Sequence, residues 1–331
     1  MDLKGRILSG HRPTGKLHIG NLKGALENWV RLQEEYECFF EIAIWHALTT
    51  EYENTQMVKD SIREVVTDWL AVGLDPAKST LFVQSDVPEH AELHLLLSMI
   101  VPVSWLERNP TLKEQIRDLN LEGKINYGHL GYPVLQAADI IIYKANAVPV
   151  GEDQLAHVEL TREIVRRFNG LYGNVFPEPK ALVTQFSKVP GLDGKKMSKS
   201  LGNAIMLSDS PQEIEGRVKQ AFTDPSKIYR GDAGHPDKCL VFEYNKIFGS
   251  PDLAEIEKDC KSGTLGCVDC KAVAARLISD YLAPIREKRR ELEQKKGYVE
   301  EVLKEGSEKA RKVAKETMAA VRKAMKIWNG G

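Results

Sequence analysis

RPTGKLHIGN, residues 12–21, lies between a short apolar run at residues 7–9 and apolar residues that recur at helical spacing from Ile19 to Leu32. This order predicts a strand, a glycine-rich turn and a helix. Free backbone N–H groups and the positive end of the helix dipole meet where such a helix begins, which favours bound phosphate. The stretch therefore predicts a phosphate-binding turn, and an ordinary capped turn of a βα unit is the alternative interpretation.

Four residues of this turn suit a phosphate ligand. Gly15 and Gly20 let the backbone approach a ligand that a Cβ would block. His18 and Asn21 are one helical turn apart and can both donate to phosphoryl oxygens. The turn is neither a P-loop nor the dinucleotide-binding glycine motif, because the spacing that each motif requires is missing.

The first 200 residues indicate an α/β fold. Short apolar runs alternate with helical patterns, which predicts a Rossmann-like parallel sheet covered by helices. Ligands of such sheets lie beyond the carboxyl ends of the strands, so we expect residues 12–21, the turn at Gly151 and a loop at residues 191–203 to converge there. The predicted strands are residues 6–9, 39–44, 80–84, 147–150 and 181–184.

A chain of 331 residues is long enough for two domains. The first, residues 1–203, contains the sheet and a helical insertion at about residues 87–130. Strand signals fade after Asn203, so residues 204–331 are expected to form an all-α domain. Its helical patterns cover residues 208–222, 272–294 and 298–328.

KKMSKS, residues 195–200, places three ammonium groups and two hydroxyls between Gly194 and Gly202. Lysines this close repel one another, so a folded loop tolerates them best where an anion compensates their charge. The composition suits a polyphosphate. Taken alone, a solvated basic turn is the commoner explanation of such a run.

Composition and charge narrow the class of protein. The sequence is 42% hydrophobic and 28% charged, which is typical of a globular protein, and its longest apolar stretch, residues 95–103, is too short to span a bilayer. Residues 1–10 lack the apolar core of a signal peptide, so we expect a cytoplasmic protein. The net charge is −1, but residues 271–331 carry 16 Lys and Arg against 9 Asp and Glu, a net +7. This basic tail indicates either a nucleic-acid partner or solvated amphipathic helices.

Four of the five cysteines form a candidate metal site: Cys239, Cys260, Cys267 and Cys270. The Cys-x2-Cys pair with two further cysteines nearby is typical of metal ligation inside cells, where disulfides are disfavoured. Four thiolates bind either zinc or a [4Fe–4S] cluster, and spacing does not separate the two. Cys38, in an apolar strand, is expected to be a core residue.

Two motifs resemble the signatures of class I aminoacyl-tRNA synthetases. HIGN at 18–21 resembles the HIGH motif and KMSKS at 196–200 matches the motif of that name, in the expected order. GYPVLQAAD at 131–139 and VPVGEDQ at 148–154 resemble the tryptophanyl-tRNA synthetase family, and the likeness extends over nearly the whole chain. A minority of that family resembles this chain in having four cysteines that ligate [4Fe–4S] in the anticodon-binding domain.

The resemblance implies an activity and its site residues. Tryptophan would be activated with ATP and Mg²⁺ and transferred to tRNA(Trp) by a homodimer whose contact surface lies mostly in the insertion. The implied catalytic residues are His18, Asn21, Lys196 and Lys199. The implied ATP contacts are Arg12, Pro13, Thr14, His18, Gly20, Asn21, Gly151, Glu152, Asp153, Val189, Lys196, Met197, Ser198, Lys199 and Ser200. The tryptophan site would use Asp139, Tyr132, Gln136, Gln154, Leu8, Val148 and Val150, and the cluster would use Cys239, Cys260, Cys267 and Cys270, with zinc as the alternative.

Asp139 is expected to select the amino acid. An indole has one N–H donor and no acceptor, whereas an ionised carboxylate has only acceptors. Apolar neighbours such as Leu135 and Ile142 favour a buried position over a surface acid. Tyrosyl-tRNA synthetases share the pattern of Tyr132, Gln136 and Asp139, and a phenol can also donate to a carboxylate, so tyrosine stays an alternative substrate. The GEDQ sequence at residues 151–154 and the paired alanines before Asp139 favour tryptophan.

Three positions depart from the family pattern, namely Ile44, Arg12 and Gln136, and they affect details of the pocket more than the reaction class. Two other functions remain open: a small-molecule adenylyltransferase, and a metal-stabilised nucleic-acid-binding protein without catalysis. His90 and His94 are one helical turn apart and could bind metal, but no third ligand is nearby. A solvated helix face is therefore the expectation for this pair.

Overall fold

The computed structural model describes residues 3–118, 123–183, 189–199 and 201–328. One parallel sheet has the strand order β3-β2-β1-β4-β5, which confirms the predicted Rossmann-like sheet. All five predicted runs contribute a strand, although Thr184, at the end of the last run, is outside the described residues. The strands are β1 (Arg6–His11), β2 (Glu37–Ile42), β3 (Ser79–Val83), β4 (Ala147–Val150) and β5 (Lys180–Val183).

The order of the strands reverses at β1. The chain proceeds from β1 to β2 and β3 on one side, then returns to β4 and β5 on the other. Ile7 of β1 is in register with Cys38 of β2 and with Ala147 of β4. In a doubly wound sheet this reversal leaves a crevice beyond the carboxyl ends of the two strands that flank it, here β1 and β4. The expected ligand position is therefore next to residues 12–21 and Gly151.

Helices cover both faces of the sheet because side chains alternate along each strand. Ile7 lies in one apolar cluster with Trp29 and Trp69, and Leu8 lies in the other with Phe82. Cys38 is buried in the first cluster, as predicted for a core residue. The helices up to the third strand are α1 (Ile19–Asn21), a π-helical turn at Leu22–Leu26, α2 (Glu27–Leu32), α3 (Ile44–Glu51) and α4 (Thr55–Val72); the next are α5 (Glu89–Ser98), α6 (Val103–Arg108), α7 (Pro110–Asp118), α8 (Tyr127–Ile142) and α9 (Leu155–Tyr172).

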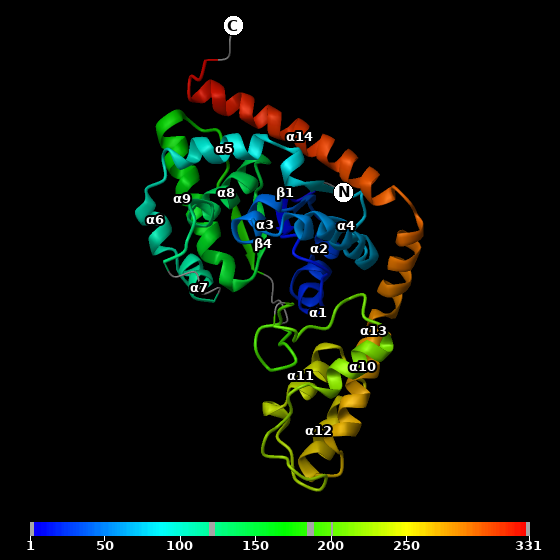
Figure 1. Cartoon of the computed structure of the whole chain (residues 1–331). Helices are drawn as coiled ribbons and strands as arrows, with labels where there is room; N and C mark the ends of the chain where they lie inside the picture. Colours follow the sequence, from blue (N-terminus) through cyan, green and yellow to red (C-terminus); the bar gives the residue numbers. More distant parts are fainter. Residues whose placement is uncertain (1–2, 119–122, 184–188, 200, 329–331) are drawn as a thin grey trace.

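Helices dominate after residue 203, as predicted. The first, α10 (Pro211–Lys219), begins at a capping box in which Ser210 and Glu213 exchange hydrogen bonds. Figure 1 shows α10, α11 and α12 grouped away from the sheet, with α13 leading back toward it. None of the described helices combines the length and apolar character needed to cross a membrane. The remaining helices are α11 (Leu240–Ile247), α12 (Leu253–Ser262), α13 (Cys267–Gln294) and α14 (Tyr298–Ala324).

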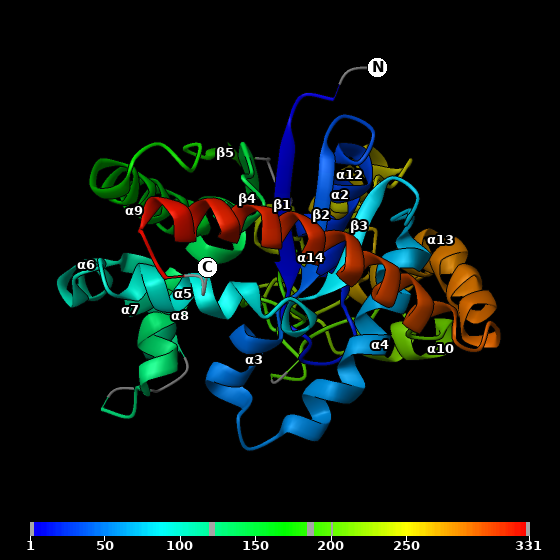
Figure 2. The same ribbon diagram turned by 90° about the horizontal axis from the view of Figure 1, so that it is seen from above.

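The last helix, α14, lies across the sheet (Figure 2). A Cβ on Gly306 would lie only 1.8 Å from the carbonyl oxygen of Leu81, so glycine is the residue that permits this approach to β3. Ser307 accepts a hydrogen bond from the Val83 N–H at 3.3 Å and donates to Asp86 at 3.0 Å. Ala310, Ala314, Met318 and Val321 of this helix belong to the same apolar cluster as residues of α8 and α9.

Candidate active site

The turn after β1 has the strand-turn-helix geometry that the sequence predicts. His18 is the N-cap of α1, and its Nδ1 accepts a hydrogen bond from the Asn21 N–H at 3.3 Å. The Asn21 side chain accepts one from the His18 N–H at 3.0 Å. This reciprocal capping box fixes both side chains relative to the start of the helix.

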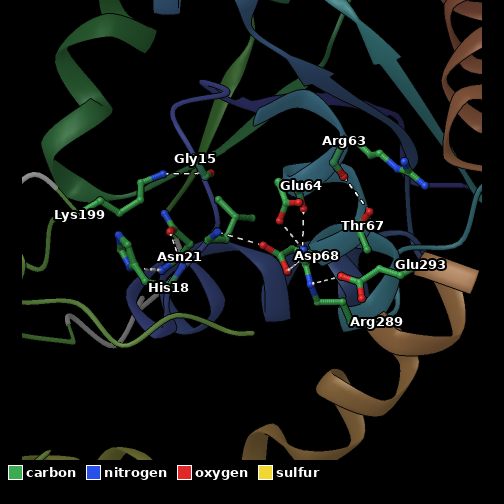
Figure 3. Close-up of polar contacts among 11 residues, drawn as sticks. Gly15, His18, Asn21, Arg63, Glu64, Thr67, Asp68, Lys199, Arg289 and Glu293 are labelled. Carbon is green, nitrogen blue, oxygen red and sulfur yellow. Dashed lines mark hydrogen bonds and ion pairs between the residues drawn. The ribbon is translucent and has the colours of Figure 1, made fainter. Parts of the chain in front are cut away.

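The loop at residues 191–203, called the lysine loop below, faces this turn. Lys199 Nζ donates to the Gly15 carbonyl oxygen at 3.1 Å and lies 3.5 Å from Thr14 Oγ1 (Figure 3). A Cβ on Gly20 would lie 2.9 Å from His18 Nδ1 and 3.6 Å from the sulfur of Met197. The two segments far apart in sequence thus meet at the carboxyl end of β1.

Backbone hydrogen bonds join the two segments on either side of His18. The Ile19 N–H donates to the Ile205 carbonyl at 3.0 Å, and the Leu207 N–H donates to the Leu17 carbonyl at 2.9 Å. The residues that follow the lysine loop are therefore anchored directly to the turn. An anchor of this kind lets the loop keep its position while its lysine side chains remain available to a ligand.

Asn203 organises the lysine loop, a role that the sequence analysis did not identify. Its Oδ1 accepts from the Ser198 N–H at 2.8 Å, and its Nδ2 donates to the Lys196 carbonyl at 3.2 Å and to Asp193 at 2.7 Å. Gly191 allows the amide to sit there, because a Cβ would lie 2.3 Å from Asn203 Nδ2. Lys196 itself has an exposed side chain, and Ser200 is outside the described residues.

Burial sets the protonation of the basic groups. Together with the smaller effect of the Lys199 charge, it lowers the pKa of His18 to about 4. The pKa of Lys199 is lowered to about 8, chiefly by burial; the Asp68 carboxylate opposes this change and Arg12 adds to it. At neutral pH the turn therefore presents a neutral imidazole and an ammonium group whose proton is held less tightly than that of an exposed lysine.

The other predicted nucleotide residues differ in burial and in their contacts. Arg12 follows β1 and donates to Thr50 Oγ1 on α3, while its Nε has no hydrogen-bond partner among the described residues. Gly151 follows β4 and is the N-cap of a 3-10 turn. Pro13 and Val189 are buried, Glu152 is exposed, and the side chain of Asp153 is outside the described part.

Asp139 is fully buried on α8, which rules out the surface-acid alternative, but its surroundings are more polar than the sequence suggested. Its carboxylate accepts from His46 Nε2 at 2.8 Å, from His90 Nδ1 at 2.6 Å and from Gln84 Nε2 at 2.9 Å. The apolar neighbours in sequence line the helix, whereas α3, α5 and the turn that follows β3 bring the polar partners. Sequence spacing could not show this convergence.

His90 corrects one expectation. It was expected on a solvated helix face, but its side chain is 0% exposed, with Nδ1 on Asp139 and Nε2 2.6 Å from Tyr143 Oη. His94, one turn along α5, is half-buried. The face of α5 that carries His90 packs on α8, so this histidine orients the acid instead of meeting water.

Asp139 and Glu41 are neighbouring buried acids whose pKa values are shifted in opposite directions. Burial by itself would raise the pKa of Asp139, but hydrogen bonds from His46 and His90 outweigh it and hold the pKa well below its usual range. Burial raises the pKa of Glu41 well above its usual range, and the neighbouring Asp139 charge raises it further. Ligand atoms of Glu41, His46 and Asp139 lie within 4.8 Å of one another. The arrangement therefore concentrates one negative charge on Asp139, which favours a donor ligand.

The remaining predicted tryptophan residues are buried or half-buried. Leu8 on β1 and Val148 and Val150 on β4 are buried in the same apolar cluster as Tyr132. Tyr132 Oη is 2.7 Å from His157 Nε2 on α9, so this hydroxyl already has a partner. Gln136 and Gln154 are half-buried.

The four clustered cysteines line one cavity, together with Thr223, Val241 and Leu265. Cys239 is the N-cap of α11, Cys260 lies on α12, and Cys267 and Cys270 lie on the first turn of α13. All are free thiols. Burial and, to a smaller extent, the other three thiols raise the pKa of Cys270 to about 12. Four thiols from three helices thus share one cavity, and thiols are ligands that zinc and iron–sulfur clusters use.

Comparison with known proteins agrees with this geometry. A family model described as tRNA synthetases class I (W and Y) matches residues 3–283. Tryptophan–tRNA ligase of Thermotoga maritima is 53% identical over 328 residues, which cover 97% of this chain and 99% of that protein. The tryptophan–tRNA ligase of Aquifex aeolicus is 49% identical over an alignment of 393 residues, which covers 97% of this chain and 100% of that protein.

A solved structure is also similar over almost the whole chain. It is tryptophanyl-tRNA synthetase from Campylobacter jejuni complexed with ADP and tryptophan, with a TM-score of 0.85, 33% sequence identity and coverage of 97% of this chain and 100% of that one. The HIGN turn and the KMSKS loop are thus found in a fold shared with a synthetase of known structure. The chain belongs to the class I tRNA synthetases of the W and Y family, on its tryptophanyl-tRNA synthetase branch.

Proposed function

We propose that this chain is a tryptophan–tRNA ligase. A tryptophan carboxylate oxygen attacks the α-phosphorus of ATP, the bond to the bridging oxygen breaks, and pyrophosphate leaves. A ribose hydroxyl at the 3′ end of tRNA(Trp) then attacks the carbonyl carbon and AMP leaves. The observation that carries the proposal is the contact of Lys199 with Gly15, which supports a triphosphate site between the lysine loop and the turn at residues 12–21.

The chain's own groups supply alignment and charge in this reaction. His18 and Asn21 donate to phosphoryl oxygens, and Lys196 and Lys199 neutralise the leaving pyrophosphate. The substrate is ATP with Mg²⁺ on its phosphates. Further ATP contacts are assigned to Arg12, Pro13, Thr14, Gly20, Gly151, Glu152, Asp153, Val189, Met197, Ser198 and Ser200.

Selection of tryptophan is assigned to the buried carboxylate. The indole N–H donates to Asp139, while Leu8, Val148 and Val150 form the walls. Tyr132, Gln136 and Gln154 lie toward the amino and carboxylate groups. A buried site built around one substrate donor rejects phenylalanine by roughly 10⁴-fold or more, because the acceptor is then left without a partner.

Amino-acid-dependent exchange of labelled pyrophosphate into ATP tests the activity. Tryptophan is expected to drive exchange, and tyrosine and phenylalanine are expected to be at background. Exchange driven by tyrosine alone would show that the chain is a tyrosine–tRNA ligase instead. If no amino acid drives exchange, the remaining interpretation is a nucleic-acid-binding protein without catalysis. Aminoacylation of a tRNA(Trp) transcript, with tRNA(Tyr) as the matched control, tests the second step.

Residues 204–331 are proposed as the anticodon-binding domain, with residues 1–203 as the catalytic domain. The protein would work in the cytoplasm, where tRNA is charged. It would also be a homodimer. Large apolar side chains exposed in the insertion support a contact surface there, and sedimentation of Met99→Lys against the unchanged chain tests it. These exposed residues are Leu95, Met99, Val103, Ile125 and Tyr127.

The cysteine cavity is proposed to hold a [4Fe–4S] cluster, with zinc as the alternative. The donor set fits, because all four thiols line the same cavity. The cluster would cross-link α11, α12 and α13. Iron and acid-labile sulfide analysis of anaerobically purified protein tests this assignment, with Cys267→Ser expected to lose iron and Cys38→Ser expected to keep it. Stoichiometric zinc without iron would reject the cluster.

A further inference from the structure

A buried carboxylate holds the backbone of the turn at residues 12–21. Asp68 lies on α4, is 0% exposed, and accepts a hydrogen bond from the Leu17 N–H at 2.9 Å. Its other oxygen accepts from Arg289 (Figure 3). Leu17 directly precedes His18, so the acid fixes the Lys16–Leu17 peptide, one residue before the histidine.

Arg289 brings the second half of the chain to this point. It lies on α13, is only 4% exposed, and also pairs with Glu64 and, through Nε at 3.0 Å, with Glu293. A buried charge is stable in a protein only when partners compensate it. Burial raises the pKa of Asp68 to about 6, and the charge of Arg289 opposes this rise, so the acid is mostly ionised at neutral pH.

Leu17 is held at both of its polar backbone atoms. Asp68 holds its N–H, and the Leu207 N–H holds its carbonyl oxygen at 2.9 Å. The second contact comes from the strand-like segment that follows the lysine loop. A structural ion pair between α4 and α13 would need only Arg289, Glu64 and Glu293, whereas the bond to Leu17 connects that pair to the nucleotide site.

We propose that Asp68 and Arg289 are positioning residues for ATP, through which α13 fixes the turn that carries His18 and faces Lys199. The proposal rests on the tryptophan-activating function proposed above. It assigns the pair no contact with substrate. Its consequence is that damage to the pair weakens ATP binding and leaves tryptophan binding at Asp139 unchanged.

Asp68 also acts on Lys199 through its charge. Arg12 and Asp68 act on the pKa of the Lys199 ammonium group in opposite directions: Arg12 lowers it and Asp68 raises it. Two histidines, His11 and His18, also face Lys199, and burial lowers their own pKa values to about 3 and about 4. Both histidines are neutral near pH 7, so Asp68 is the counter-charge. Loss of its charge is expected to make Lys199 release its proton at lower pH.

Steady-state pyrophosphate exchange with Arg289→Met and Asp68→Asn tests the proposal. The KM for ATP is expected to rise by about 10-fold to 100-fold, as for a misplaced binding group, while the KM for tryptophan changes less than about 2-fold. Arg289→Lys, which keeps the charge, is expected to recover part of the ATP affinity. In Asp68→Asn the alkaline limb of kcat/KM for ATP is expected to move to lower pH, which loss of packing would not cause.

Arg311→Met is the matched control, because Arg311 on α14 pairs with the buried Glu89 at 3.2 Å but is not part of the ATP site. Its KM for ATP should equal that of the unchanged chain. If Arg289→Met lowers thermal stability but keeps the original KM for ATP, or raises both KM values equally, the pair is structural only and the proposal is wrong. Exchange by the unchanged chain separates this result from failure of the proposed function, which would abolish activity in every variant.

Discussion

Lys199 Nζ lies 3.1 Å from the carbonyl oxygen of Gly15, although 184 residues separate them in the sequence. The contact places an ammonium group against a helix start whose glycines and histidine suit phosphate. A cation and a helix N-terminus both stabilise the charge that develops on a leaving pyrophosphate. This contact therefore links the two sequence motifs in one candidate site.

Replacement of Lys199 by methionine is expected to lower kcat for pyrophosphate exchange by about 10²-fold to 10³-fold, the usual cost of losing one group that stabilises transition-state charge. Lys195→Met is the matched control, because the Lys195 side chain is exposed and, among the described residues, makes no hydrogen bond or ion pair with the turn. Equal losses in both variants would show that total loop charge matters and the position of Lys199 does not. Single-turnover formation of the adenylate measures the effect.

The pH dependence of the reaction is expected to follow Lys199. Burial lowers the pKa of its ammonium group to about 8 in the free protein. The charged form binds phosphate, so kcat/KM for ATP should be constant below this pKa and fall as the pH rises through it. In Lys199→Arg, whose guanidinium stays charged, the alkaline fall should be absent. Persistence of the same limb in that variant would assign it to another group.

Asp139→Asn is expected to raise the KM for tryptophan by about 100-fold, since a hydrogen bond to a charged group is worth about 1.5–3 kcal/mol. The KM for ATP in the same variant is the internal control and should change little, because the lysine loop and the turn are not in contact with this acid. Exchange at varied tryptophan and fixed ATP measures it. An unchanged KM for tryptophan would place the indole elsewhere.

Tyr143→Phe tests the support of that acid. The Tyr143 hydroxyl is 2.6 Å from His90 Nε2, whose other ring nitrogen contacts Asp139. Without the hydroxyl, the tautomer and the orientation of the imidazole are no longer fixed. The KM for tryptophan is therefore expected to rise by about 10-fold, similar to the effect of removing the hydrogen-bond partner of a metal-bound histidine. Tyr172→Phe, a change of the same size on α9, is expected to have no effect.

Gly306→Ala tests the packing of α14 on the sheet. The new Cβ would lie 1.8 Å from the Leu81 carbonyl oxygen, so the free energy of unfolding is expected to fall by about 2 kcal/mol or more. Gly216→Ala in α10 meets no atom within 4 Å and is expected to raise it by up to about 1 kcal/mol. Urea denaturation measures both. Equal stability of the two variants would mean that α14 can move from the sheet at little cost.

The sequence determined the local features of this protein. Alternating apolar runs predicted all five strands, and the turn at residues 12–21 predicted the capped helix start, because hydrogen-bonding side chains and glycines act on their immediate neighbours. The cysteine spacing indicated one shared site. Family motifs added the expected order of the HIGN turn, Asp139 and the lysine loop.

Only the tertiary structure decided which side chains meet. Gln84, His46 and His90 come from three separate segments to Asp139, and no spacing in the sequence reveals that convergence. His90 was expected in solvent because helical periodicity does not tell which neighbour covers a polar face. Arg289 reaches Asp68 across 221 residues, since the packing of α13 on α4 depends on the fold of the whole chain.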